Sequence, residues 1–189
     1  MSSTHKFKRG FKKFADDKSI ELRKELGIRP SHPLPGLALA EHLKAKVIYP
    51  KDVPDLDPQS LSYLLKGNDS EWSGVALHVQ DQPLIIINNS QSLARQESTI
   101  MHELAHIICG HSMGEFKPLS DGILLRNFNK EHEREAEWLG GCLQLPGVAL
   151  YYSHEDGLSI QEISEKFNAS VDMVRFRINM CGIGKRRKK

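Results

Sequence analysis

Residues 92–111 of the chain read SLARQESTIMHELAHIICGH, and this stretch decides the fold prediction. It contains no proline, and apolar side chains surround its polar centre on nearly every side, which predicts a long and largely buried helix. The helix should begin near Ser92 or Ser98, both suitable N-cap residues, and end at Gly110. The apolar side chains around the polar centre are Ile100, Met101, Leu104, Ala105, Ile107 and Ile108.

The polar centre, HELAH, has the spacing of a metal site. His102 and His106 are four residues apart, so in a helix both imidazoles lie on one face and can reach one ion. Neutral imidazole is a good zinc ligand, and a catalytic zinc site has three protein ligands and one open position. Glu103 lies about 100° round the helix, beside that position, as the candidate base for a water molecule. The alternative is a chance match, with both histidines as hydrogen-bonded core residues.

The third ligand has to come from elsewhere in the chain. His111 is one candidate, but HELAHIICGH misses the HExxHxxGxxH pattern, because its last histidine comes one residue early and its glycine one residue late. A second predicted helix, residues 130–145, carries Glu133 and Glu137 four apart on one face. Either alone is an ordinary surface carboxylate, whereas beside HELAH either becomes a candidate ligand.

The rest of the chain predicts an α+β fold, mostly helical, with a small antiparallel sheet. Two β-branched runs separated by three polar residues, 72–79 and 83–89, predict a hairpin. The C-terminal part predicts a helix-turn-helix-like pair around residues 168–170. The remaining expected elements are helices at 14–26 and 34–44, a strand at 46–50, a helical turn at 60–67 and a loop at 111–130.

Three stretches, taken in order, resemble one known family. They are ARQESTIMHELAHII (94–108), EREAEWLGGCLQLP (133–146) and EISEKFNASVDMVRFRINMCGI (162–183). Together they are similar to the motifs of the ImmA/IrrE metallopeptidases, over roughly residues 20–183. The resemblance implies a zincin-like fold in which two helices face each other across a metal ion.

The resemblance also implies roles for individual residues. His102 and His106 would be ligands of a Zn²⁺ cofactor, and Glu103 would be the catalytic base. Aligning the second motif on Pro146 places the family's leading glutamate at Glu133, as the third ligand. The same donor set also holds manganese or iron, so the sequence does not fix the metal.

Other candidate site residues follow from departures and gaps in the match. The family's asparagine is Glu137 here, which introduces a competing carboxylate. His111 has no counterpart to carry over. Tyr151, Tyr152 and His154 are candidates for stabilising an oxyanion, with surface or core positions as the alternative for each.

The function implied by the resemblance is a cytoplasmic peptidase of bacteria or their mobile elements. Such an enzyme makes limited cuts in a partner protein, typically a helix-turn-helix transcriptional repressor, or acts in a toxin–antitoxin pair. An extended substrate could add to a sheet edge. We expect the strand at 83–89 to offer that edge, unless it is a covered core strand.

Composition sets the remaining expectations. The three cysteines have no CxxC spacing, and the first thirty residues are polar and lysine-rich, so neither a disulfide framework, a targeting segment nor a membrane span is predicted. A reducing, cytoplasmic setting fits best. The predicted organisation is a basic flexible tail (1–13), a zincin-like core (14–150), a helical appendage packed on it (151–183) and a second basic tail (184–189).

Two other functions remain open at this point. The basic ends and the C-terminal helices could make the chain a non-enzymatic regulator that binds DNA or a protein, since RFR and RRKK offer phosphate contacts. The helix over VDMVRFRINM, however, has few side chains suited to base edges. Zinc-dependent hydrolysis of a non-peptide amide has no positive feature in the sequence, and the oligomeric state is open.

Overall fold

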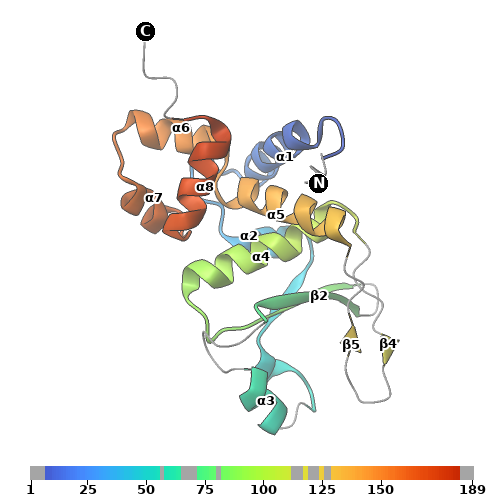
Figure 1. Cartoon of the computed structure of the whole chain (residues 1–189). Coiled ribbons are helices and arrows are strands. Elements are labelled where there is room, and N and C mark those ends of the chain that lie inside the picture. The colour runs from blue at the N-terminus through green and yellow to red at the C-terminus, as the bar shows by residue number, and fades with distance from the viewer. Residues whose placement is uncertain are drawn as a thin grey trace, which may run out of the picture.

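The computed structural model describes residues 7–55, 58–64, 72–79, 82–111, 117–118, 124–125 and 129–183. Helix α4 (Leu93–Ile108) lies at the centre, with the sheet against one side and α5 (Lys130–Gln144) against the other (Figure 1). Helix α1 (Phe11–Glu25) packs on α5, and the short α2 (Gly36–His42) packs on α4. The two facing helices that carry the metal motif therefore form the middle layer, and the α+β class is confirmed.

Helix α4 begins and ends where the sequence offers caps. The Ser92 side chain accepts a hydrogen bond from the backbone N–H of Arg95, at 3.3 Å, which selects Ser92 over Ser98 as the N-cap. At the other end, Gly110 has a φ of 64°, a left-handed conformation that suits glycine. The middle of the helix is buried, including Met101 and Leu104.

The three-stranded sheet has the order β1–β3–β2 and is mixed. Strand β3 (Gln82–Ile87) pairs antiparallel with β2 (Gly74–Val79) and parallel with β1 (Lys46–Ile48). Only the antiparallel hairpin was expected. The prediction that the strand at 83–89 offers a free edge is wrong, because β3 is central and paired on both sides. Among the described strands of this sheet, β2 is the edge beside α4.

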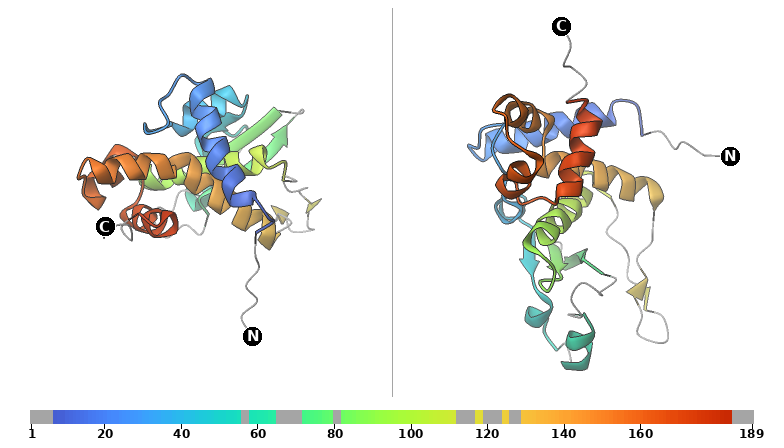
Figure 2. Two further views of the ribbon diagram at one scale, coloured as in Figure 1. Left: turned by 90° about the horizontal axis from the view of Figure 1, so that it is seen from above. Right: turned by 60° about the vertical axis from the view of Figure 1, so that its left-hand side comes forward.

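The C-terminal helices form their own small core. Helices α6 (Gly147–Glu155), α7 (Ile160–Lys166) and α8 (Val171–Cys181) gather at one end of the molecule (Figure 2). Their apolar cluster consists of Leu145, Ala149, Leu150, Ile163, Phe167, Ala169 and Val174. The cluster includes Leu145, and the expected boundary at 150/151 falls inside α6. The boundary between the main apolar core and this C-terminal core therefore lies at the end of α5, near Pro146.

Part of the N-terminal stretch that was expected to be a flexible tail has an ordered structure. Helix α1 starts at Phe11 and not at residue 14, and the ring of Phe11 stacks on that of Phe7 with centroids 5.5 Å apart. Phe7 in turn lies edge-on to Trp138 of α5, at 5.2 Å. Phe7 therefore anchors the start of the described chain on α5, whereas residues 1–6 and the basic stretch 184–189 lie outside the described residues.

The remaining described elements are small. A 3₁₀ turn (Pro50–Asp52) and α3 (Pro58–Leu64) follow β1, and the expected loop at 111–130 contains a two-stranded pairing of β4 (Lys117–Pro118) with β5 (Leu124–Leu125). In the part of the chain that the structure describes, no helix has both the length and the apolar character that crossing a membrane requires.

Candidate metal centre

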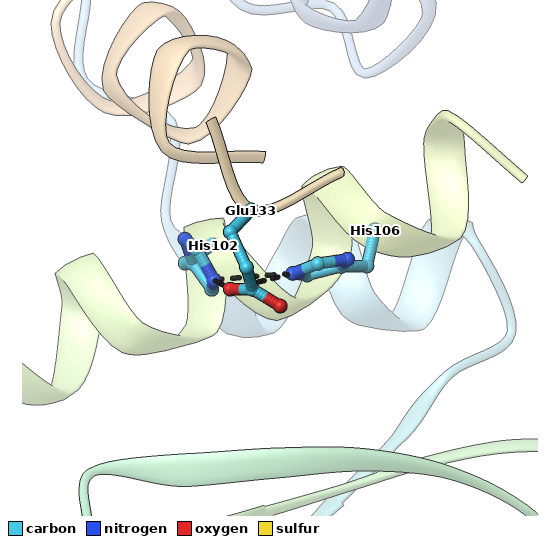
Figure 3. Close-up of side chains that lie close together, drawn as sticks. All are labelled: His102, His106 and Glu133. Atoms are coloured by element: carbon cyan, nitrogen blue, oxygen red, sulfur yellow. Dashed lines mark hydrogen bonds and ion pairs between the residues drawn. The ribbon is translucent and has the colours of Figure 1, made fainter. Parts of the chain in front are cut away.

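Three side chains from the two facing helices meet at one point. His102 and His106 project from α4 and Glu133 projects from α5, and all three point toward one another (Figure 3). The Nε2 atoms of the histidines are 3.1 Å apart. The Glu133 Oε2 atom lies 3.2 Å from His102 Nε2 and 3.6 Å from His106 Nε2.

This triangle fits a zinc ion. Zinc binds imidazole and carboxylate at about 2.0–2.2 Å in tetrahedral geometry, so two neighbouring ligand atoms lie about 3.3–3.5 Å apart. The three measured separations, 3.1, 3.2 and 3.6 Å, span that value. Two nitrogens and one carboxylate oxygen are also the donor set of a catalytic site with an open fourth position. Within the described residues, this is the one group of metal-binding type.

Small residues on α5 allow the close approach that brings Glu133 to the histidines. Ala136 is fully buried, and a Cβ placed on Gly140 would lie 3.1 Å from the backbone of His102. The Asn129 side chain caps α5 by accepting from the N–H groups of Glu131 and His132. Glu133 thus stands in the first turn, where the helix dipole favours a carboxylate.

Glu103, the candidate base, lies in a cleft beside the triangle. Its side chain is buried, with 3% exposed, yet it lines a cleft of about 470 Å³ together with His102 and Glu133. The cleft also takes in the start of β2, at Ser73 and Gly74. Glu103 is not a member of the triangle, but it lines the same cleft as two of the triangle's residues.

The cleft continues along α4 toward the C-terminal helices. A neighbouring cavity of about 390 Å³ shares four lining residues with it and extends to Phe176 of α8. The shared residues are Arg95, Ser98, Glu137 and Met173. Helix α8 therefore forms a wall of the hollow that leads to the metal triangle.

The structure separates the other predicted candidates from the triangle. Glu137 is exposed on the cleft wall, one turn after Glu133, and is not part of the group. Tyr151, Tyr152 and His154 line a different cavity of about 740 Å³, between α6 and α8. This larger hollow contains no residue of the metal triangle, whereas the smaller cleft is lined by His102 and Glu133.

His111 also lies outside the triangle, but it touches one of its members. Its Nδ1 atom is 3.1 Å from Nδ1 of His106, and its Nε2 atom is 3.0 Å from Oε2 of Glu135. Burial lowers the pKa of His111, and the hydrogen bond to Glu135 opposes that effect. Sequence reasoning missed Glu135, because a carboxylate between Glu133 and Glu137 has no periodic signal that sets it apart.

Sequence reasoning also missed Arg95 and Ser73 at the rim of the cleft. The Arg95 guanidinium donates to the Ser73 hydroxyl through Nε at 3.2 Å and through Nη2 at 2.9 Å. This pair ties the first half of α4 to the segment that leads into β2. Only the tertiary fold brings these two positions together.

Comparison with known protein families settles the family. The model of the IrrE N-terminal-like domain, a peptidase family, matches residues 59–179, which is more than half of the chain. The chain belongs to this family. The matched span of the IrrE-like family runs from α3 into α8 and contains all three residues of the triangle as well as Glu103. The resemblance drawn from the three sequence motifs is confirmed, and the scaffold is of the metallopeptidase type. A search of curated proteins found no match.

Proposed function

We propose that the protein is a zinc-dependent endopeptidase that makes limited cuts in a partner protein in the cytoplasm. The partner would be a helix-turn-helix transcriptional repressor or an antitoxin. The observation that carries the proposal is the triangle of His102, His106 and Glu133, with the Glu103 carboxylate buried beside it in an open cleft. Membership of a peptidase family supports the same reading.

In this mechanism each residue has one task. His102 and His106, through Nε2, and Glu133 would hold the ion, which when bound polarises the scissile carbonyl and acidifies water. Glu103 accepts the proton from the attacking water and returns it to the leaving amine. Its burial, with 3% of the side chain exposed, keeps solvent from competing for that proton.

The edge of β2 supports binding of the substrate as an extended strand. A Cβ on Gly74 would lie 2.5 Å from Cγ2 of Thr99, so glycine is needed for β2 to start directly on α4. Thr99 comes one turn before His102, and Gly74 lines the cleft beside it. An extended segment that adds to β2 would therefore pass over the metal triangle. Such binding favours flexible loops or linkers over folded domains, which is consistent with limited cleavage.

The direct test is cleavage of a helix-turn-helix repressor or antitoxin, taken from the genes beside this one where they encode such a protein. The purified chain loaded with zinc should produce discrete fragments on a gel and by mass spectrometry. Glu103→Gln should retain one zinc per chain and produce no fragments, because amide nitrogen and oxygen cannot take up the proton. Glu131→Gln, an exposed change on α5, is the matched control and should cleave normally. Undiminished cleavage by Glu103→Gln would refute the peptidase mechanism.

A further inference from the structure

The end of α4 folds His111 back onto His106. The backbone N–H of Gly110 donates to the carbonyl of Ile107 at 3.1 Å, and that of His111 donates to the carbonyl of His106 at 3.0 Å. With Gly110 left-handed, this is the Schellman arrangement, in which the residue after the glycine contacts the residue five positions earlier. That contact is usually apolar. Here it joins two histidines, one of which belongs to the metal triangle.

The contact continues as a buried chain of polar atoms. His106 Nδ1 lies 3.1 Å from His111 Nδ1, and His111 Nε2 lies 3.0 Å from Glu135 Oε2. The three residues are 2%, 6% and 7% exposed, in that order. Water therefore does not replace these contacts readily, and each polar atom depends on its protein partner.

The proton count along this chain has one solution when His106 Nε2 is the ligand atom. A neutral imidazole bound through Nε2 carries its proton on Nδ1, which donates to the lone pair on His111 Nδ1. His111 then carries its own proton on Nε2 and donates it to the Glu135 carboxylate. Every proton in this series of hydrogen bonds has an acceptor, and the series ends on the negatively charged carboxylate of Glu135.

We propose that His111 and Glu135 are positioning residues for the metal ligand His106. They fix the tautomer and the ring orientation of His106, and the negative charge of the buried Glu135 carboxylate acts on this ligand through the ring of His111. Outer partners of this kind typically change metal affinity by about 10–100-fold. This inference rests on the metal site of the proposed function and extends it to two residues outside the triangle.

Helix α5 supplies both Glu133 of the metal triangle and Glu135 at the far end of this series of hydrogen bonds. The nearest cation to Glu135 among the described residues is Lys8, whose ammonium is exposed and 3.9 Å away. The ring of His132 stacks on His111 at 4.2 Å, with 4° between the planes. The stack supports the ring of His111 but adds no hydrogen bond to the chain.

The test is zinc affinity of the full chain, measured by competition with a chromophoric chelator. The variants are His111→Phe, Glu135→Leu and their combination, and His132→Phe is the matched control because it preserves the stacked ring. Thermal unfolding of the metal-free proteins checks folding, and either single variant decides the matter if the other does not fold. The visible spectrum of the cobalt-substituted proteins reports whether the ligand set is unchanged.

We expect each single variant to bind one zinc about 10–100-fold more weakly than the wild type, with an unchanged cobalt spectrum. Because Glu135 acts through His111, the double variant should be no weaker than His111→Phe by more than about twofold, and His132→Phe should match the wild type. Wild-type affinity in both single variants would overturn the inference. So would complete loss of the zinc in His111→Phe, since His111 would then be a ligand. A wild-type chain without zinc would instead refute the proposed function.

Discussion

Gly140 of α5 lies against the backbone of His102, so that a Cβ on this glycine would come within 3.1 Å of both Cα and N of the histidine. The obstacle is helix backbone, which does not move aside as a flexible side chain does. This contact fixes the distance between α4 and α5, and through it the distance from Glu133 to the two histidines.

We therefore predict that Gly140→Ala destabilises the fold and weakens zinc binding together. Overpacking against backbone costs about 1–3 kcal/mol, of which the better helix propensity of alanine returns up to about 1 kcal/mol. Gly141→Ala is the control, because its Cβ would meet the Arg177 side chain, at 3.3 Å, and no backbone. Urea unfolding and zinc competition measure both effects. Equal stability and zinc affinity in Gly140→Ala and Gly141→Ala would contradict the close-approach argument.

Phe176→Ala should weaken substrate binding without changing zinc binding. Phe176 is 45% exposed and lines the cavity that continues from the metal cleft. If bound substrate covers the exposed half of this side chain, the burial contributes about 1 kcal/mol to the free energy of substrate binding. In Phe176→Ala the KM should therefore rise about fivefold, with little change in kcat. Met180→Ala is the control on the same helix, since Met180 lines the separate cavity near α6. A KM that rises as much in Met180→Ala would argue against the cleft as the substrate path.

Cys142 should make stability fall with pH in the alkaline range. Burial raises the pKa of this thiol from its ordinary value of 9.0 to about 12, and the neighbouring Asp16 adds to the effect. Between those values the folded chain keeps the proton that the unfolded chain releases. The contribution of the Cys142 thiol to the free energy of unfolding is therefore present below pH 9 and lost toward pH 12. The stability of wild type minus that of Cys142→Ala should therefore shrink between pH 8 and pH 10 in urea unfolding. A constant difference would contradict the assigned burial.

DNA binding should be absent, despite the helix-turn-helix-like pair. On α8, Arg177 is 1% exposed and its Nε donates to the carbonyl of Leu145, so it cannot contact phosphate. Arg175 is exposed but lies 3.2 Å from Asp172, within an acidic–basic pair. Electrophoretic mobility shift of the full chain, and of a chain ending at residue 183, should show no salt-dependent complex. A shift that weakens steeply with salt would instead support the regulator hypothesis.

Local signals in the sequence predicted the helices of the site well. Ser92 and Gly110 cap the first helix as expected, and the second spans Lys130–Gln144 against a predicted 130–145. Cap chemistry and apolar periodicity act over a few residues, which is why they can be read directly. The hairpin of β2 and β3 was predicted for the same reason.

Features that depend on distant parts of the chain escaped prediction. The parallel pairing of β1 with β3 joins residues almost forty positions apart, and it moves the free edge to β2. Likewise, Phe7 anchors the N-terminal segment on Trp138 only because α1 packs on α5. Glu135 gains its contact with His111 from the same helix arrangement. Helix α6 was also not expected.

The central claim is that His102, His106 and Glu133 hold a single zinc ion. The most direct test is the zinc content of the purified protein, measured by elemental analysis after exhaustive dialysis. It compares the wild type with two variants, each of which loses one of two carboxylates four residues apart. The account predicts one zinc per chain in the wild type and in Glu137→Ala, and loss of that zinc in Glu133→Ala. Retention in Glu133→Ala with loss in Glu137→Ala would contradict it.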